Sequence, residues 1–440
     1  MRTACLLACA AVLALSHPAL ALTPAETAQW REDLRFMAET LPATHKNLYH
    51  SISPAAFASE VRALDDQLPS LSRAEVIVGL ERIVASIGDG HTNIYPTRDP
   101  RIGFHTLPVR FTWFEDGLYV RAARPEARRW LGARVVRIGD RSVAEAEAEV
   151  ESLVGHENAG GARYWGQYLL AMPEVLAALR ITDAPGEVPL TLATAAGQER
   201  VVLRPDSPID IMTGDISTLY YLQPGWLDVR EASGAPTPPW LRDLSAPFRL
   251  EHVGDLLYAR INTVQNAPGE TLAQFASRLK AEIAATRPAK LAIDLRQNRG
   301  GDGTLIPPLI RAIIQSESID QPGRLFVLIG PATFSAAQML TDAFETYTNA
   351  TFVGEPSGSK GNAYGDSRKI VLPNSGITVR ASIYYWQDWH PADRRDATYP
   401  QVKAPLTFDA YRRGIDPGLA AIEAAAPDKP KPPRAPTAPG

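Results

Sequence analysis

From residue 246 onward, short apolar runs alternate with amphipathic stretches, and this alternation constrains the fold more than any other feature of the sequence. The runs "LLYARI", "LAIDL" and "RLFVLIG" have the length and composition of buried strands. Between and after them, 271–285, 305–315 and 335–347 carry apolar residues at helical spacing. The later runs "ATFVGE", "KIVL" and "ITVRASIYYW" predict further strands. Strands that alternate with helices predict a layered α/β domain, which we place at residues 246–425.

The N-terminus has the pattern of a secretory signal. Arg2 precedes an apolar run over residues 4–15, and the small-residue sequence "ALA" follows at 19–21. The run is short for a membrane span, and the alternatives are an N-terminal anchor or a lipoprotein site at Cys9. Cleavage after residue 21 would remove both cysteines, Cys5 and Cys9, and with them any disulfide, thiol nucleophile or thiolate metal site. We expect an exported protein, periplasmic or secreted.

The regions between the signal and the α/β domain differ in pattern. Ser72 and Glu75 have the spacing of a capping box, and apolar residues on one helical face follow them. Further along, alternating apolar and polar residues in "GLYVRAARPEARRWLGARVVRIGD" are typical of strands. The predicted order is a signal peptide (1–21), a helical region (22–92), a β-rich domain with one or two helices (93–205), a Pro-containing connector (206–245), the α/β domain (246–425) and a Pro-rich disordered tail (426–440).

Charge and composition exclude several classes of partner. The formal net charge is −4, and no basic stripe of the kind that binds nucleic acid is present. No later segment is apolar enough to be an integral membrane helix once the signal is removed. The sequence leaves the oligomeric state open.

Two adjacent glycines follow one of the predicted buried strands. "RQNRGGDGT" (296–304) contains Gly300 and Gly301, whose backbone angles are free of side-chain restrictions and whose amides a ligand can approach. Such a loop can be a tight turn, a phosphate cradle or half of an oxyanion hole. The phosphate motif G-x-x-x-x-G-K-[ST] is absent, which counts against the second of these.

Three polar residues stand where catalytic groups are often found. Ser335 lies at a strand-to-helix junction, where it can cap the helix or act as a nucleophile beside helix amides. His91 lies in the loop "GDGHT", and histidine is well suited to general-base work near neutral pH. Lys360 lies in the glycine-rich "GSKGNAYGD". Taken singly, the three are better explained as a helix cap, a structural histidine and a solvated lysine.

Together these segments resemble the tail-specific, or C-terminal processing, serine peptidases, whose relatives include the tricorn core protease and the interphotoreceptor retinoid-binding proteins. "AIDLRQNRGG", "TFSAAQMLTDAF", "ATFVGEPSGSKG", "GDGHT" and "GIDPGLAAIEAA" are similar to ordered elements of that group. The resemblance covers roughly residues 60–425. It implies a catalytic domain with a layered fold like those of the crotonases and Clp proteases, and it implies no metal and no organic cofactor.

The resemblance also implies roles for particular residues. Ser335 would attack the scissile carbonyl, and the amide of Ala336, with that of Gly300 or Gly301, would hold the oxyanion. The processing peptidases use a lysine base, which Lys360 matches.

The tricorn-like branch uses the histidine that His91 matches, together with an acidic residue nearer the C-terminus. Asp393 or Asp396 would supply that acid. We favour His91, because it needs little pKa shift to act near pH 7, and place Lys360 in the pocket lining. Two departures from the family pattern, Gln338 and Gln401, put the supporting residues in doubt and leave Ser335 unaffected.

The β-rich domain resembles a PDZ module, chiefly in "GARVVRIGDRSV"; an ordinary β-rich insertion is the alternative. The function that follows is that of an exported serine endopeptidase acting on protein or peptide substrates through an acyl-enzyme on Ser335. The alternative is a non-catalytic binding protein on the same fold, which would have no need to keep Ser335, His91 and Lys360 together. An acyl-CoA-handling enzyme is a third reading, and the predicted export counts against it.

Overall fold

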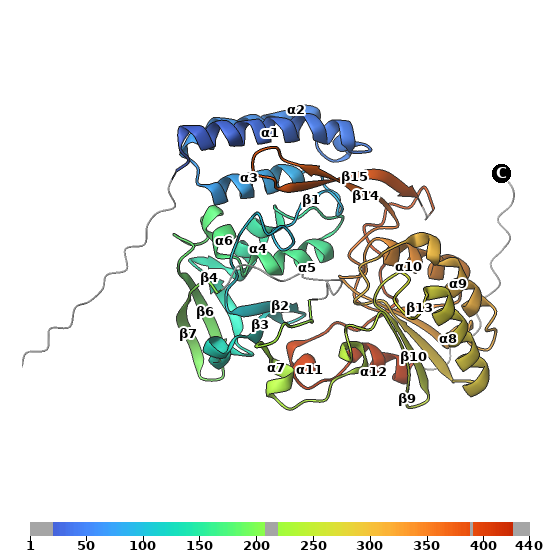
Figure 1. The fold of residues 1–440 in the computed structure, drawn as a ribbon. Helices are drawn as coiled ribbons and strands as arrows, with labels where there is room; N and C mark the ends of the chain where they lie inside the picture. Colours follow the sequence, from blue (N-terminus) through green and yellow to red (C-terminus); the bar gives the residue numbers. More distant parts are fainter. Residues whose placement is uncertain (1–20, 207–218, 388–389, 426–440) are drawn as a thin grey trace, which may run out of the picture.

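A six-stranded, mostly parallel sheet forms the centre of the C-terminal α/β domain. The computed structural model describes residues 21–206, 219–387 and 390–425 (Figure 1). The order of the strands in this sheet is β16-β13-β12-β11-β10-β9, and only β9 runs antiparallel to its neighbour. The strands are β9 (Phe248–Val253), β10 (Leu256–Ile261), β11 (Lys290–Asp294), β12 (Leu325–Ile329), β13 (Thr351–Gly354) and β16 (Val402–Lys403).

Helices cover both faces of this sheet, and the side chains of β10 show how. Every residue of β10 is buried, as expected for a parallel strand covered on both sides. Leu257 packs in the apolar cluster that contains residues of α8, α9 and α10, and Tyr258 packs in the opposite cluster with Leu419 of α12. The helices are α8 (Leu272–Thr286), α9 (Pro307–Ile314), α10 (Ala336–Tyr347) and α12 (Pro417–Ala424).

The β-rich domain is an antiparallel sheet flanked by helices. Its main strands follow the order β2-β3-β4-β6-β7, with the short strands β5 and β8 at its margins. The strands are β2 (Val109–Phe114), β3 (Gly117–Ala123), β4 (Arg134–Ile138), β5 (Arg141–Ser142), β6 (Val188–Thr194), β7 (Gly197–Leu203) and β8 (Leu227–Asp228). The helices are α4 (Val143–Glu151), α5 (Ala159–Leu169) and α6 (Pro173–Ala178), one more than the sequence predicts.

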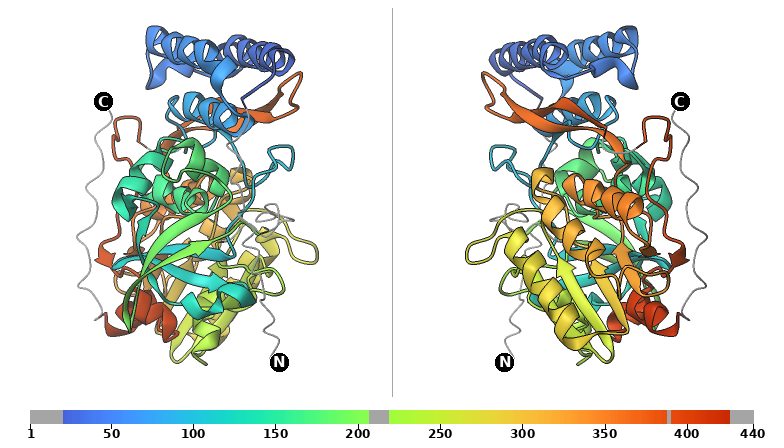
Figure 2. Two further views of the ribbon diagram at one scale, coloured as in Figure 1. Left: turned by 90° about the vertical axis from the view of Figure 1, so that its left-hand side faces the viewer. Right: turned by 90° about the vertical axis from the view of Figure 1, so that its right-hand side faces the viewer.

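The N-terminal helices are joined to the C-terminal domain by a long hairpin. Strands β14 (Asn362–Val371) and β15 (Thr378–Gln387) leave the α/β domain and lie beneath α1 and α2 (Figures 1 and 2). There β15 pairs with β1 (Asn93–Ile94), directly after the "GDGH" loop. The helices are α1 (Pro24–Thr44), α2 (Pro54–Gln67) and α3 (Arg73–Ala85), and the predicted capping box of Ser72 and Glu75 opens α3. This crossing brings His91 to the edge of the α/β domain.

The predicted fold class is confirmed: an α/β layered domain accompanies an N-terminal helical region and a β-rich domain. The segment predicted as an irregular connector contains β8 and α7 (Val229–Ala232), and α11 (Phe408–Arg412) precedes α12. The predicted signal peptide lies almost entirely outside the described residues, as does the predicted Pro-rich tail. In the part of the chain that the structure describes, no helix is both long and apolar enough to cross a membrane.

Candidate functional site

Ser335 is held in an unusual backbone conformation at the start of α10. Its φ of 58° and ψ of −128° are rare for a residue with a side chain, and such strain costs about 1–3 kcal/mol. The loop before it is fixed to the glycine loop, because the Phe334 amide donates to the Asn298 carbonyl at 3.2 Å. Ser335 occupies the N-cap position, but its side chain makes no capping hydrogen bond. Its Oγ lies instead 3.0 Å from Nε2 of His91.

His91 is oriented towards Ser335 by packing and by nearby negative charge. Its ring stacks on Phe334, with the ring centroids 4.6 Å apart. Burial lowers the pKa of His91 below its usual 6.5, while the charges of Asp89 and Asp366 and the carbonyl of Tyr364 act to raise it. The imidazole is therefore mainly neutral at pH 7 and can accept a proton from Ser335.

Asp89 fixes the loop that carries His91. Its carboxylate accepts the His91 amide at 3.1 Å, the His45 Nε2 at 2.9 Å and the Ser382 hydroxyl at 2.6 Å. Burial acts to raise the pKa of Asp89, but hydrogen bonds from His45, His50 and Ser382 hold it far below its usual range. Asp89 thus ties together the loop after α3, the end of α1 and strand β15.

Two backbone amides face the same cavity as the Ser335 hydroxyl. This cavity has a volume of about 340 Å³, and Gly301, Ser335 and Ala336 line it. The Gly300 amide donates to Oδ1 of Asn298 at 2.9 Å, so it is already engaged. No acceptor for the amides of Gly301 and Ala336 is found within the described residues. These two amides are the pair that can stabilise an oxyanion.

The glycines owe their positions to close packing. A Cβ atom on Gly300 would lie 2.7 Å from Cβ of Ser335 and 2.8 Å from the Ala336 nitrogen. A Cβ atom on Gly301 would lie 2.2 Å from the Val264 carbonyl oxygen. Both residues have positive φ, 103° and 145°, which favours glycine. Substitution at either position would displace the loop as well as its amide.

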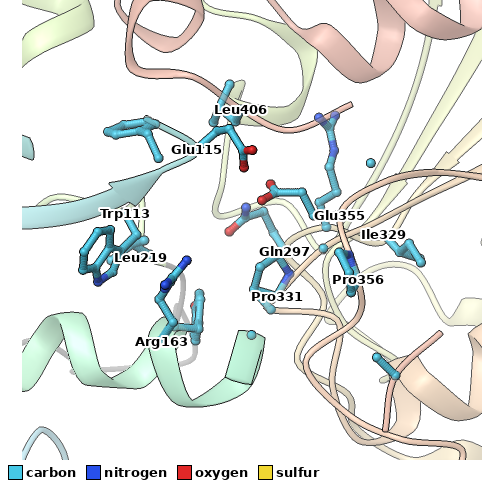
Figure 3. A pocket seen from close by; sticks show the side chains of 18 of the residues that line it. Trp113, Glu115, Arg163, Leu219, Gln297, Ile329, Pro331, Glu355, Pro356 and Leu406 are labelled. Atoms are coloured by element: carbon cyan, nitrogen blue, oxygen red, sulfur yellow. The ribbon is translucent and has the colours of Figure 1, made fainter. Parts of the chain in front are cut away.

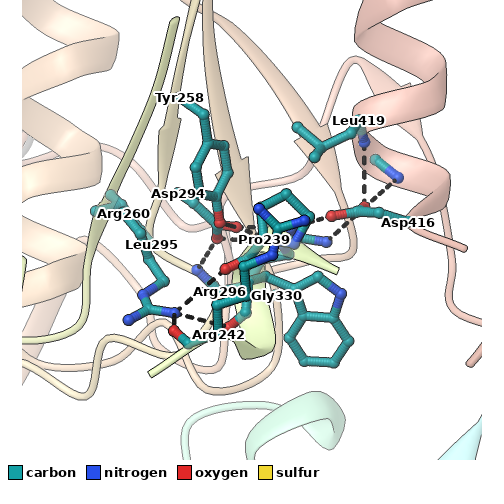
Figure 4. A network of polar contacts seen from close by, with 12 residues as sticks. Pro239, Arg242, Tyr258, Arg260, Asp294, Leu295, Arg296, Gly330, Asp416 and Leu419 are labelled. Atoms are coloured by element: carbon teal, nitrogen blue, oxygen red, sulfur yellow. Dashed lines mark hydrogen bonds and ion pairs between the residues drawn. The ribbon is translucent and has the colours of Figure 1, made fainter. Parts of the chain in front are cut away.

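A buried ion-pair network anchors the strand that leads into this loop (Figure 4). Arg296 binds Asp294 and also donates to both carboxylate oxygens of Asp416, at 2.9 and 2.8 Å. The hydroxyl of Tyr258 donates to Asp294 at 2.6 Å. Burial acts to raise the pKa of Asp294, but the Arg296 charge keeps it below its usual value. The network connects β11 to α12 and so fixes the start of the glycine loop.

Of the remaining predicted residues, Lys360 lies at the Ser335 cavity, whereas Asp393 and Asp396 bind other side chains. Lys360 is half-buried and lines the Ser335 cavity, and no hydrogen bond or ion pair joins it to another described residue. Asp393 pairs with Arg395, and Asp396 accepts the Tyr399 hydroxyl at 2.8 Å. The structure therefore does not bring either aspartate into a hydrogen bond with His91.

Sequence reasoning missed the carboxylates that do influence His91. Asp366 lines the Ser335 cavity from β14 and has a positive φ of 52°. Asp89 stands two residues before His91, and that spacing was the only local signal for it. His45 and Ser382, which hold Asp89, gave no signal in the sequence because they reach the site only through the packing of α1 and β15.

Comparisons with known proteins give the fold. No protein-family model matches the sequence, and no curated protein matches it either. A structure of mature CPAF complexed with lactacystin shares 13% sequence identity over 90% of this chain and 97% of the other, with a TM-score of 0.58. A second structure of mature CPAF gives 13% identity over 90% and 96% of the two chains, with a TM-score of 0.56. The chain has the fold of these structures along nearly its whole length.

Proposed function

We propose that the protein is a serine-type endopeptidase that cleaves protein or peptide substrates through an acyl-enzyme on Ser335. The observation that carries the proposal is the 3.0 Å contact between Ser335 Oγ and His91 Nε2 at a cavity with two unengaged backbone amides. A nucleophile, a base within hydrogen-bond reach and donors for a developing oxyanion are the parts that acyl transfer needs. The resemblance of "TFSAAQMLTDAF" and "AIDLRQNRGG" to tail-specific peptidases points to the same chemistry.

The geometry supports a two-step reaction. Ser335 Oγ attacks the peptide carbonyl carbon as His91 Nε2 takes the hydroxyl proton, and the carbonyl oxygen becomes an oxyanion held by the amides of Gly301 and Ala336. The C–N bond then breaks, and His91 returns the proton to the leaving amine. A water molecule, deprotonated by His91, hydrolyses the ester and restores Ser335.

His91 is the better candidate for the base. It contacts Ser335 directly, whereas no contact between Lys360 and Ser335 is found among the described residues. The charges of Asp89 and Asp366 stabilise the imidazolium that forms during attack. Lys360 lies in the wall of the same cavity, where a positive charge can bind an anionic group of the substrate.

Location and substrate capture complete the proposal. The predicted signal at residues 1–21 supports export to the periplasm or the exterior. The β-rich domain, with its resemblance to a PDZ module, is proposed to present the peptide to the α/β domain.

A serine-reactive fluorophosphonate probe tests the proposal. The wild-type protein should gain the mass of the probe on Ser335, and Ser335→Ala should gain none. His91→Ala should react at least a hundredfold more slowly, because the hydroxyl has lost its base. Ser277→Ala, which changes an exposed serine on α8, serves as the matched control. Equal labelling of wild-type and Ser335→Ala protein would favour the non-catalytic binding protein.

A further inference from the structure

A second cavity lies apart from the one that contains Ser335. It has a volume of about 390 Å³ and lies between the β-rich domain and the α/β domain (Figure 3). On one side it is lined by the end of β2 and by α5, and on the other by the loops after β11, β12 and β13. The carboxyl ends of parallel strands are the common place for a ligand in α/β folds.

Two carboxylates from different domains meet in this cavity. Glu115, at the end of β2, and Glu355, after β13, point towards one another (Figure 3). No ion pair to either side chain is found within the described residues. Burial, followed by the charge of Glu115, raises the pKa of Glu355 to about 7. An unneutralised acidic pair in a partly buried space favours a positively charged partner.

The arginines at the cavity are already paired with acids. Arg296 is held by Asp294 and Asp416. Arg163 donates to Glu147 at 2.6 Å and lies over the ring of Trp113. Neither arginine therefore forms an ion pair with Glu115 or Glu355, although the charges of both act on Glu355 from a greater distance.

The walls of the cavity suit an organic cation better than a metal ion. The side chains that line it are largely apolar: Trp113, Leu219, Ile329, Pro331, Pro356 and Leu406. Magnesium and calcium ions need about six oxygen ligands or bound waters, which such walls do not supply. Trp240, only 3% exposed, also lines the cavity, and its indole N–H has no acceptor within the described residues. A ligand with a carbonyl group would supply that acceptor.

We propose that this inter-domain cavity binds the side chain of a lysine or arginine residue of a polypeptide, with its cationic group between Glu115 and Glu355. The aliphatic stem would lie along the apolar walls, and a backbone carbonyl would accept the Trp240 N–H. The claim that the basic residue belongs to a substrate rests on the proposed peptidase function. The claim that the cavity binds a basic residue does not depend on that function.

The position of the cavity relates it to the catalytic loops. Gly330, Pro331 and Ala332, which lead to Ser335, form part of its wall, and so does Gln297 at the start of the glycine loop. A basic residue bound here would contact these loops from the side away from the Ser335 cavity. The site would thus select substrates that carry a lysine or arginine at a distance from the bond that is cleaved.

Peptide binding to the full chain carrying Ser335→Ala tests the proposal without turnover. The probes are fluorescein-labelled Ala-Ala-Lys-Ala-Ala-amide and the same peptide with norleucine in place of lysine, followed by fluorescence anisotropy at pH 8. We expect the lysine peptide to bind at least tenfold more tightly. Adding Glu115→Gln and Glu355→Gln together should bring the two affinities within twofold and leave norleucine-peptide binding unchanged. Glu199→Gln, an exposed position on β7, is the matched control.

The pH dependence gives a second, independent measurement. Glu115, Arg296 and Arg163 are the charged groups that act on Glu355. Since Glu355 becomes protonated as the pH falls through about 7, the preference for lysine should weaken between pH 8 and pH 6. Thermal melting of the double variant establishes that it is folded.

Other outcomes would overturn the proposal. Equal binding of the two peptides in the Ser335→Ala background, or a preference that survives the double substitution in folded protein, would refute it. So would displacement of the lysine peptide by micromolar calcium chloride, which would indicate a metal site. If wild-type protein cleaves no peptide while the lysine preference holds, the peptidase function fails and the cavity assignment stands. If the protein cleaves peptides but shows no preference for lysine, the peptidase function stands and the cavity assignment fails.

Discussion

Replacing His91 with alanine should abolish most peptide hydrolysis, and the structure sets the size of the effect. The His91 Nε2 lies 3.0 Å from Ser335 Oγ, within the range in which a general base works. Loss of a general base typically slows a reaction by about 10²–10⁴-fold, which corresponds to roughly 3–5 kcal/mol of transition-state stabilisation. Lys360→Ala, measured on the same peptide at pH 7, should retain at least about a tenth of the wild-type turnover, because no contact joins Lys360 to Ser335.

The pH profile of kcat/KM distinguishes the two bases without relying on a single variant. A base acts in its deprotonated form, so activity rises as the pH rises through the pKa of the base. Burial lowers the pKa of His91, so half-maximal activity should fall below pH 6.5. Removing a negative charge with Asp366→Asn should lower that pKa further and move the acid limb to still lower pH.

Two results would refute this reasoning. One is a turnover for Lys360→Ala that is lower than that of His91→Ala, with both variants folded. The other is an acid limb above pH 8 in the wild-type protein, which would indicate a lysine base with a depressed pKa. Either would establish a serine–lysine dyad and leave His91 a structural role beside Phe334.

Three further substitutions test other parts of the structure. Gly300→Ala should lower turnover more than a hundredfold and reduce the melting temperature, because the new Cβ would lie 2.7 Å from Cβ of Ser335. Gly186→Ala is the control and should change neither quantity, because no atom lies within 4 Å of the added Cβ. Burial raises the pKa of Glu157 to about 7, so its contribution to stability is complete below pH 4.5 and is lost as the pH rises through 7. Glu157→Gln should therefore remove a pH-dependent loss on the order of 3 kcal/mol between pH 5 and pH 8 in urea unfolding, and an unchanged slope would contradict that account. Glu81 is 1% exposed, and neither of its carboxyl oxygens has a hydrogen-bond partner within the described residues. Glu81→Leu should therefore raise the free energy of unfolding at pH 7 by about 1–3 kcal/mol. A lower free energy of unfolding would show that the carboxyl group is satisfied.

The sequence predicts the layers of this protein well because strands and helices leave local patterns. The short apolar runs at β11 and β12 and the helical spacing of α10 depend on residues that are close in sequence. The same locality made Ser335 recognisable as a residue at a strand-to-helix junction. The number of helices in the β-rich domain was underestimated, since α5 contains three glycines and three aromatic residues and has a weak helical propensity.

The arrangement around the site could not be predicted in the same way. Which of Gly300 and Gly301 has an amide free to bind the oxyanion depends on which amide donates to the Asn298 side chain. The sequence gives no signal that distinguishes the two glycines. The orienting carboxylate was expected at Asp393 or Asp396, where no local pattern distinguishes them, and both bind other side chains. Asp366 and Asp89 reach His91 only because the β14–β15 hairpin crosses to β1.

That crossing also determines when a newly made chain can bring Ser335 and His91 together. Ser335 and His91 are separated by 244 positions in sequence, and Thr92 meets Ser382 across 290. A ribosome-bound chain that ends before Ser382 already contains Ser335, His91 and the glycine loop. It lacks the strand that pairs with β1 and the hydroxyl that donates to Asp89, so two of the contacts that hold the histidine loop in place are missing. Under the proposed function, a growing polypeptide is harmless to itself and to its neighbours until β15, which is made after Ser335, can pair with β1.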